Sequence, residues 1–297
     1  MSNLDKNFKK TLELILTRGY KKEDRTGTGT ISFPGVMIRH DMSEGYPLLT
    51  LRKIPFKSAA VELEGFIKGI TSKKWYKDRG CNYWNQWCAP YLVKYGHDEE
   101  TKKKMELEDE LGPIYGKQGR EFAQWVLELD PSDQKFLDRT GPKIDQLKNL
   151  INELKSNPNS RRMVVSYWNP LCNDLMALMP CHTHWQVNVT DGRLNLYYYM
   201  RSVDFVLGNN LNSYGLLLHL LAKEANLKEG TLVGFFADAH LYTNHIDGAN
   251  ELLTRSTDGV LPTIKTDKFT SIFDWQYSDT VLSDYNPQAS IKFDVAV

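Results

Sequence analysis

The fold is decided by residues 184–242, where the chain reads HWQVNV (184–189), LNLYYYM (194–200), SYGLLLHLLAKEA (213–225) and LVGFFADAHLY (232–242). The first, second and fourth runs are rich in β-branched and aromatic residues, and Asp191-Gly192 supplies a turn between the first two. The third run is apolar nearly all round, as a buried helix is. This order predicts an α+β fold with a mostly antiparallel sheet packed with helices, one of them buried.

Further elements extend this pattern toward the N-terminus. ISFPGVMIRHDM (31–42) alternates as a strand does, and residues 56–69 predict a helix with Gly65 in its interior. The run GHDEETKKKMELEDE (96–110) is so strongly charged that we expect a solvated excursion. No linker or repeat divides the chain, so we expect a single domain over residues 1–297.

Composition narrows the class of protein. Lys+Arg and Asp+Glu are equal at 37 each, so no global charge field indicates binding to nucleic acid or to a membrane. The four cysteines are too sparse for a disulfide framework and favour a reducing compartment. Because the N-terminus reads as an amphipathic helix and no apolar run is long enough for a membrane span, we expect a cytoplasmic protein.

Cys181 is the candidate nucleophile, although a lone buried cysteine is usually a small hydrophobic residue. His182 is a poor base for it, because neighbours on a strand point to opposite faces. Zinc binding is not expected, since Cys81 and Cys88 lack a second pair of ligands at the usual spacing.

Arginines at turns and strand ends accompany this cysteine. Each is individually more typical of a surface charge, yet several together suit a phosphate site, because the guanidinium group binds oxyanions in a bidentate way. A nearby arginine also lowers the pKa of a thiol. The members of this set are Arg25, Arg161, Arg162 and Arg201, the last followed by Ser202.

Eight collinear segments spread over nearly the whole chain resemble the signature blocks of the thymidylate synthase family. They are RTGTGT (25–30), YWNQW (83–87), GPIYGKQ (112–118), NPNSRRMVVSYWNP (157–170), ALMPCHTHWQVNV (177–189), MRSVDFVLG (200–208), ADAHLYTNH (237–245) and IKFDVAV (291–297). The resemblance implies the thymidylate synthase fold and one-carbon transfer from 5,10-methylenetetrahydrofolate to C5 of a uracil deoxynucleotide, without a metal.

The resemblance also implies catalytic roles. Cys181 attacks C6 of the pyrimidine, Glu62 organises the water that moves protons, and Tyr115 assists proton removal from C5. An amide in the loop 208–214 reads the base: counting forward from Gly208 gives Asn212, which we favour, and counting back from Tyr214 gives Asn210. Either residue is an amide, so uracil is preferred over cytosine.

Binding roles follow in the same way. The 5′-phosphate is held by Arg25, Arg201 and Ser202, and Arg161 and Arg162 reach the neighbouring subunit's phosphate, which implies a homodimer with shared sites. The sugar 3′-hydroxyl is contacted by His240 and Tyr242. The folate side is formed by Asp204, Trp84, Trp87 and the carboxylate of Val297.

Departures from the family pattern bear on the final step of the reaction. The loop 208–214 is two residues shorter than in thymidylate synthases, as in the phage hydroxymethylases, and Gly65 and Gly119 stand where the family has Trp. Arg52 and Pro55 replace the usual folate-side lysine and histidine, and Met200 and Gln288-Ala289 replace a common Gln and a common His-Pro.

Two lost tryptophans leave a volume that could hold ordered water, unless other side chains refill it. We therefore expect a phage-type dUMP hydroxymethylase, in which water captures the methylene intermediate. Thymidylate synthase, which reduces that intermediate by hydride, is the first alternative. An inactive homologue that binds nucleotide or RNA is the second.

Overall fold

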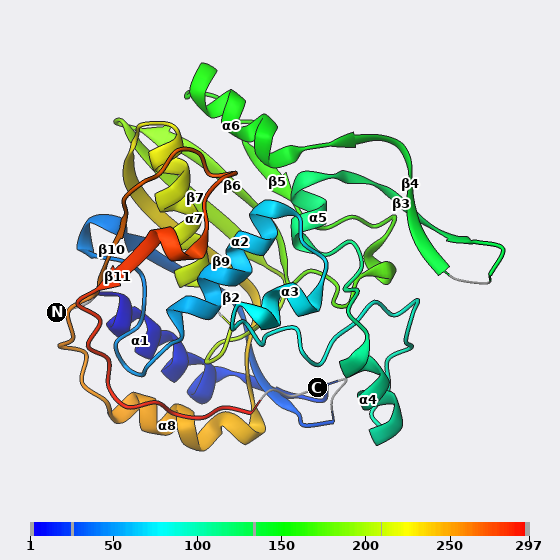
Figure 1. The fold of residues 1–297 in the computed structure, drawn as a ribbon. Coiled ribbons are helices and arrows are strands. Elements are labelled where there is room, and N and C mark those ends of the chain that lie inside the picture. Colours follow the sequence, from blue (N-terminus) through cyan, green and yellow to red (C-terminus); the bar gives the residue numbers. More distant parts are fainter. Residues whose placement is uncertain (1–2, 25–26, 133–134, 209, 295–297) are drawn as a thin grey trace. The chain divides into compact units, whose positions relative to one another are not determined.

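The computed structural model describes residues 3–24, 27–132, 135–208 and 210–294 (Figure 1). The chain forms two compact units. The first comprises Met1–Phe56, Trp185–Phe269 and Ser278–Val297, and the second comprises Lys57–His184 and Thr270–Tyr277. One domain over the whole chain stays a prediction.

A sheet forms the framework of the first unit, with strands in the order β1-β2-β9-β7-β6 and with β8 beside β9. Their bounds are β1 Tyr20–Lys22, β2 Thr30–Asp41, β6 His182–Thr190, β7 Arg193–Met200, β8 Val203–Asp204 and β9 Lys228–Tyr242. β2 is antiparallel to β1 and β9, whereas β7 and β8 are parallel to β9. The predicted α+β class is confirmed, but the strand pattern did not predict the parallel pairs. They require a long crossover, which contains helix α7.

Helix α7 (Leu211–Glu224) is the predicted buried helix. Ten of its 14 residues are buried. Gly215 lets it approach the preceding loop, because a Cβ there would lie 2.3 Å from Cγ of Pro47. The helix thus supplies much of the apolar core of this unit.

Helix α1 (Asn3–Arg18) adds an apolar stripe to the same core. It buries Leu4, Phe8, Leu12 and Ile15 at helical spacing, and Phe8 stacks on Phe205 with ring centroids 4.8 Å apart. The remaining elements of this unit are η1 (Met42–Glu44), η3 (Thr243–His245), α8 (Ile246–Thr254), β10 (Thr263–Thr266) and β11 (Thr280–Ser283), with η4 (Tyr277–Asp279) at its boundary.

The second unit is mainly helical. Its elements are α2 (Phe56–Lys68), α3 (Lys73–Asp78), α4 (Glu99–Leu107), α5 (Tyr115–Arg120), β3 (Phe122–Leu129), β4 (Lys135–Ile144), α6 (Gln146–Ser156), β5 (Val164–Ser166) and η2 (Asn173–Leu175). The antiparallel hairpin β3–β4 was not predicted. The charged segment contains helix α4, and Met105 is the one buried residue of that helix.

The space expected from a lost tryptophan at Gly65 is filled. A Cβ on Gly65 would lie 2.2 Å from Cε1 of Tyr76, whose side chain is 0% exposed. A Cβ on Gly119 would have only Cε1 of Tyr167 within 4 Å, at 3.5 Å, among the described residues outside its own helix turn. The expected polar cavity is therefore wrong at Gly65, because the ring of Tyr76 takes that volume.

These two helical glycines make a matched pair for a stability test. Gly65→Ala should lower the free energy of unfolding by about 1–3 kcal/mol, because the buried ring must move. Gly119→Ala should raise it by about 0.5–1 kcal/mol, since alanine favours a helix and its Cβ would meet Tyr167 at the ordinary contact distance of 3.5 Å. Urea denaturation measures both. A Gly65→Ala protein as stable as the wild type would contradict the close contact between Gly65 and the ring of Tyr76.

Candidate active site

Cys181 is the one partly exposed cysteine of the four, the other three being buried. It lies just before β6, and its backbone N–H donates a hydrogen bond of 2.8 Å to the hydroxyl of Tyr115. A predicted nucleophile and its predicted proton-transfer partner therefore meet, although 66 residues separate them.

Tyr115 is positioned by glycines on both sides. Gly112 has φ +74°, and a Cβ there would lie 2.1 Å from the carbonyl oxygen of Leu175. A Cβ on Gly116 would lie 2.9 Å from Cα of Phe66, so α5 packs closely on α2. Burial raises the pKa of Tyr115 well above its ordinary value, with a contribution from Cys181. The phenol consequently stays protonated at neutral pH.

Glu62 lies on α2 and accepts a hydrogen bond of 3.0 Å from Nε1 of Trp84. Burial raises the pKa of Glu62 to about 7, against the lowering effect of that bond. A carboxyl group with such a pKa exchanges protons readily near neutrality, as a general acid or base must. Glu62 and Tyr115 are electrostatically coupled, since Glu62 also raises the pKa of Tyr115.

An aromatic cluster surrounds these groups. Trp84 lies 6.1 Å from Tyr115 and 6.4 Å from Phe66 between ring centroids. His182 lies 4.9 Å from Tyr115, and burial lowers its pKa to about 3, so its imidazole is neutral. Trp87 is buried too, but it stacks on Tyr95 at 5.8 Å. Trp84 thus belongs to the cluster, whereas the ring of Trp87 stacks on Tyr95 instead.

Arg161 and Arg162 follow α6 in the second unit, and both are exposed. The backbone N–H of Arg162 donates to Oγ of Ser160 at 3.2 Å.

A second group of predicted residues gathers in the first unit. Asp204 on β8 pairs with His240 on β9, and the rings of His240 and Tyr242 lie 5.3 Å apart. Arg201 is exposed and Ser202 is half-buried, immediately before β8. Neighbouring strands thus bring Asp204, which is predicted to bind folate, beside His240 and Tyr242, which are predicted to contact the sugar.

The two candidate base-reading amides lie at the start of α7. Asn210 is the residue before the helix and has a left-handed backbone with φ 54°. Oδ1 of Asn212 accepts from the N–H of Ser213 at 2.9 Å, and its carbonyl accepts from the hydroxyl of Tyr46 at 2.6 Å. Both side chains are half-buried, so the preference for Asn212 stays a prediction.

Two predicted residues, Arg25 and Val297, lie outside the described residues. His245 was missed, although it ends the quoted block ADAHLYTNH. Only its surroundings reveal it: Nδ1 lies 3.2 Å from Oδ2 of Asp204. The presence of a histidine at position 245 does not by itself indicate that its ring faces Asp204.

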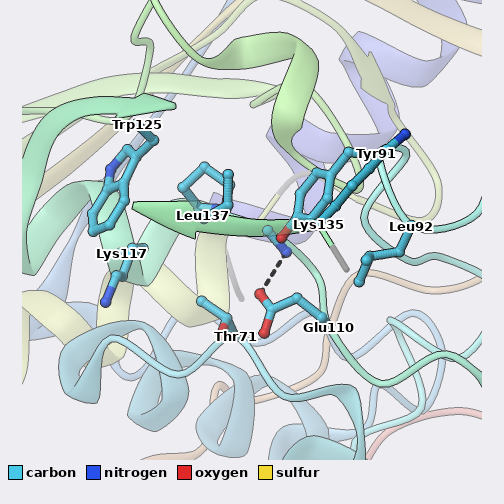
Figure 2. Close-up of a pocket in the computed structure, with 10 residues that line it drawn as sticks. Thr71, Tyr91, Leu92, Glu110, Lys117, Trp125, Lys135 and Leu137 are labelled. Carbon is cyan, nitrogen blue, oxygen red and sulfur yellow. Dashed lines mark hydrogen bonds between the residues drawn. The ribbon is translucent and has the colours of Figure 1, made fainter. Parts of the chain in front are cut away.

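A separate cavity of about 310 Å³ lies in the second unit (Figure 2). Its walls include Tyr91, Leu137 and Glu110, and none of the predicted catalytic residues lines it. The carboxylate of Glu110 accepts hydrogen bonds from Thr71 Oγ1 at 3.1 Å and from the N–H of Gly112 at 2.8 Å. Its polar needs are thereby met within the protein.

In the described part of the chain, no three His, Cys, Asp or Glu side chains are arranged to hold a metal ion. Within the same residues, no helix is long and apolar enough to cross a membrane.

Comparison with known proteins decides the family. The model of the family described as thymidylate synthase matches residues 6–297. The chain is 39% identical over 332 residues to a thymidylate synthase of Staphylococcus haemolyticus, covering 100% of each protein.

The chain belongs to the thymidylate synthase family.

A thymidylate synthase of Listeria monocytogenes is a further relative, 38% identical over 318 residues and covering 95% of this chain and 97% of that protein. The predicted family is therefore confirmed, and with it a one-carbon transferase. Both relatives carry the name of the alternative reaction rather than of the expected hydroxymethylase.

The raised pKa of Glu62 should appear in the stability of this family member. Because the folded-state pKa is about 7 and the ordinary value 4.5, the folded protein retains a proton that the unfolded chain releases between these values. This group's contribution to the free energy of unfolding therefore falls as pH rises from 4.5 to 7, and levels off above 7. Glu62→Gln should remove that fall.

Urea denaturation across this pH range, wild type against Glu62→Gln, measures the difference. The exposed Glu13→Gln variant is the control and should follow the wild-type profile. Parallel profiles for wild type and Glu62→Gln would refute a raised Glu62 pKa.

Proposed function

We propose that this protein is a thymidylate synthase, which converts dUMP to dTMP with 5,10-methylenetetrahydrofolate as carbon donor and reductant and releases dihydrofolate. The observation that carries the proposal is the hydrogen bond between Cys181 and Tyr115 beside a Glu62 carboxyl with a pKa of about 7. The names of the two relatives support the same reaction.

The chemistry needs a soft nucleophile, because C5 of uracil is unreactive until the C5–C6 bond is saturated. The sulfur of Cys181 adds to C6, and C5 then bonds to the methylene carbon of the folate as the bond from that carbon to N10 breaks. Asn212 stabilises the charge that develops at O4. A proton leaves C5 with the help of Tyr115 and of water organised by Glu62, and the remaining bond from the methylene carbon to N5 breaks, which leaves an exocyclic methylene group and tetrahydrofolate. Hydride from the tetrahydrofolate adds to this methylene group, the C6–S bond breaks to release the Cys181 thiolate, and dTMP and dihydrofolate leave.

Binding roles are assigned to further residues that match the family's motifs. Arg25, Arg201 and Ser202 hold the phosphate, and His240 with Tyr242 contacts the sugar 3′-hydroxyl. The folate is contacted by Asp204, Trp84, Trp87 and the Val297 carboxylate.

The expected hydroxymethylation ranks second. It needed water-filled space where two tryptophans are lost, and Tyr76 occupies that space at Gly65. The open surroundings of Gly119 and the short loop before α7 still favour it. Reductive methylation requires that water is excluded from the intermediate. The close packing of Tyr76 against Gly65 therefore favours this reaction.

One reaction of 5-tritiated dUMP with methylenetetrahydrofolate separates these functions. We expect tritium release and dihydrofolate absorbance to rise together, because hydride transfer oxidises the folate. Cys181→Ser should lower both by at least about 10³-fold while dUMP still binds.

Tritium release without dihydrofolate would instead identify the hydroxymethylase. Normal dUMP binding with neither signal would identify an inactive nucleotide-binding homologue. Turnover that survives Cys181→Ser would overturn the assignment of the nucleophile.

The functional unit in this proposal is a homodimer, in which Arg161 and Arg162 reach the neighbouring subunit's phosphate. An exposed apolar row on the first unit's sheet supports it. Met37 on β2 pairs with Phe235 on β9, which pairs with Tyr199 on β7, and their exposed fractions are 57%, 39% and 36%. Such a patch on a soluble protein is typical of an interface.

Phe235→Glu should convert the dimer to a monomer, because it places a charge in the middle of this row. Activity should fall with it, as the phosphate site loses the neighbour's arginines. Analytical ultracentrifugation and the tritium assay measure both. Val281→Glu, at another exposed apolar position on β11, is the control and should leave the dimer intact. A Phe235→Glu protein that stays dimeric would exclude this face.

A further inference from the structure

His245 is a buried residue between two parts of the first unit. It ends η3, is 1% exposed, and has one ring nitrogen facing each side. Nε2 lies 2.7 Å from the carbonyl oxygen of Asp294 near the C-terminus, and Nδ1 lies 3.2 Å from Oδ2 of Asp204.

The chemistry of these two partners determines the protonation of the ring. A carbonyl oxygen can only accept a hydrogen bond, so Nε2 carries a proton. If the ring were neutral, the lone pair of Nδ1 would then face a carboxylate. Nδ1 is buried and lacks the alignment of a hydrogen bond, so its interaction with Asp204 is chiefly electrostatic. Only an imidazolium ring satisfies both sides at once.

The direction of the pKa agrees with this protonation. Burial alone lowers the pKa of His245, but the carboxylate of Asp204 and the carbonyl of Asp294 outweigh it, and the net shift is upward. The cation therefore depends on Asp204 in the folded protein.

Residues 291–294 pack closely against this ring. The rings of His245 and Phe293 lie 5.2 Å apart, and the guanidinium of Arg52 lies 5.3 Å from the centroid of Phe293. Gly248, in the first turn of α8, makes the space, since a Cβ there would lie 2.6 Å from the Phe293 ring. The seat of residues 291–294 is thus built from α8, His245 and Arg52.

Asp204 is held from its other side by the backbone. Its Oδ1 accepts from the N–H of Val206 at 3.2 Å, while Oδ2 faces His245. The Asp204 side chain is 13% exposed, so a ligand can reach it. A change in the charge of this carboxylate therefore changes its electrostatic interaction with His245.

We infer that His245 is a positioning residue that couples the carboxylate of Asp204 to the seating of the C-terminal residues 291–294. Without the negative charge of Asp204, the protonated form of His245 is less stable. The hydrogen bond from Nε2 of His245 to the carbonyl of Asp294 is then weaker. By reciprocity, loosening the chain end weakens the hold of Asp204 on its ligand. The role of that ligand as folate rests on the proposed function, whereas the coupling does not.

The test is hydrogen exchange of the amides of residues 291–294 in the ligand-free protein, which requires no activity. Asp204→Asn should accelerate this exchange about fivefold or more, because it removes the charge that faces His245. Asp247→Asn removes an exposed charge two residues from His245 and is the matched control, with exchange as in the wild type. Unchanged exchange of the buried helix α7 verifies that each variant is folded.

Two substitutions of His245 separate positioning from simple filling of space. His245→Leu loses both interactions and should accelerate exchange of the chain end. His245→Gln keeps a donor toward Asp294 and should return exchange to the wild-type rate, yet it lacks the cation beside Asp204. In an active enzyme its KM for folate should rise about tenfold, with KM for dUMP within twofold.

Exchange at residues 291–294 that is the same in Asp204→Asn as in the wild type would overturn the coupling, whatever the activity. Equal rises in KM for folate and dUMP in His245→Gln would reduce His245 to a general structural role. A wild-type protein inactive on dUMP would refute the proposed function alone, because the exchange measurement still decides the coupling.

Discussion

The hydrogen bond from the Cys181 amide to the Tyr115 hydroxyl is the interaction on which the rest of the candidate site depends. Within the second unit, it joins the residue before β6 to the first residue of α5 and so fixes the proposed nucleophile relative to a buried phenol. Tyr115 can reach Cys181 only because glycines flank it, letting the chain turn at Gly112 and letting α5 approach α2 at Gly116. The catalytic geometry is in this sense a consequence of close backbone packing.

Burial then sets the chemistry of that cluster. The aromatic rings around Glu62 leave its carboxyl poorly solvated, which brings its pKa to about 7, and the same burial keeps Tyr115 protonated and His182 neutral. An acid that titrates near neutrality beside a fixed phenol suits proton transfer at C5 of a pyrimidine. The absence of a tryptophan at position 65 does not leave space for water, because the ring of Tyr76 occupies the volume beside Gly65. The packing of neighbouring side chains, and not the residue type at one position alone, determines whether a cavity can hold water.

In the first unit, strand pairing and the short helix η3 position the polar residues. Adjacent strands bring Asp204 beside His240, and η3 turns His245 back toward Asp204. The seat of Phe293 over Gly248 extends the arrangement to the chain end. A single buried ring with two unlike partners thus lies between a partly exposed carboxylate and residues 291–294.

The sequence by itself determined the α+β class, the buried helix α7, the strand β2 and the family, because periodicity and long collinear motifs are local signals. It also named Cys181, Tyr115 and Glu62 as candidates. It could not determine that β7 and β9 are parallel, that Tyr76 fills the space at Gly65, or that His245 faces Asp204. These features depend on residues far apart in the chain, and pKa values such as that of Glu62 depend on burial. Only the tertiary structure decides which distant groups meet and how much water reaches them.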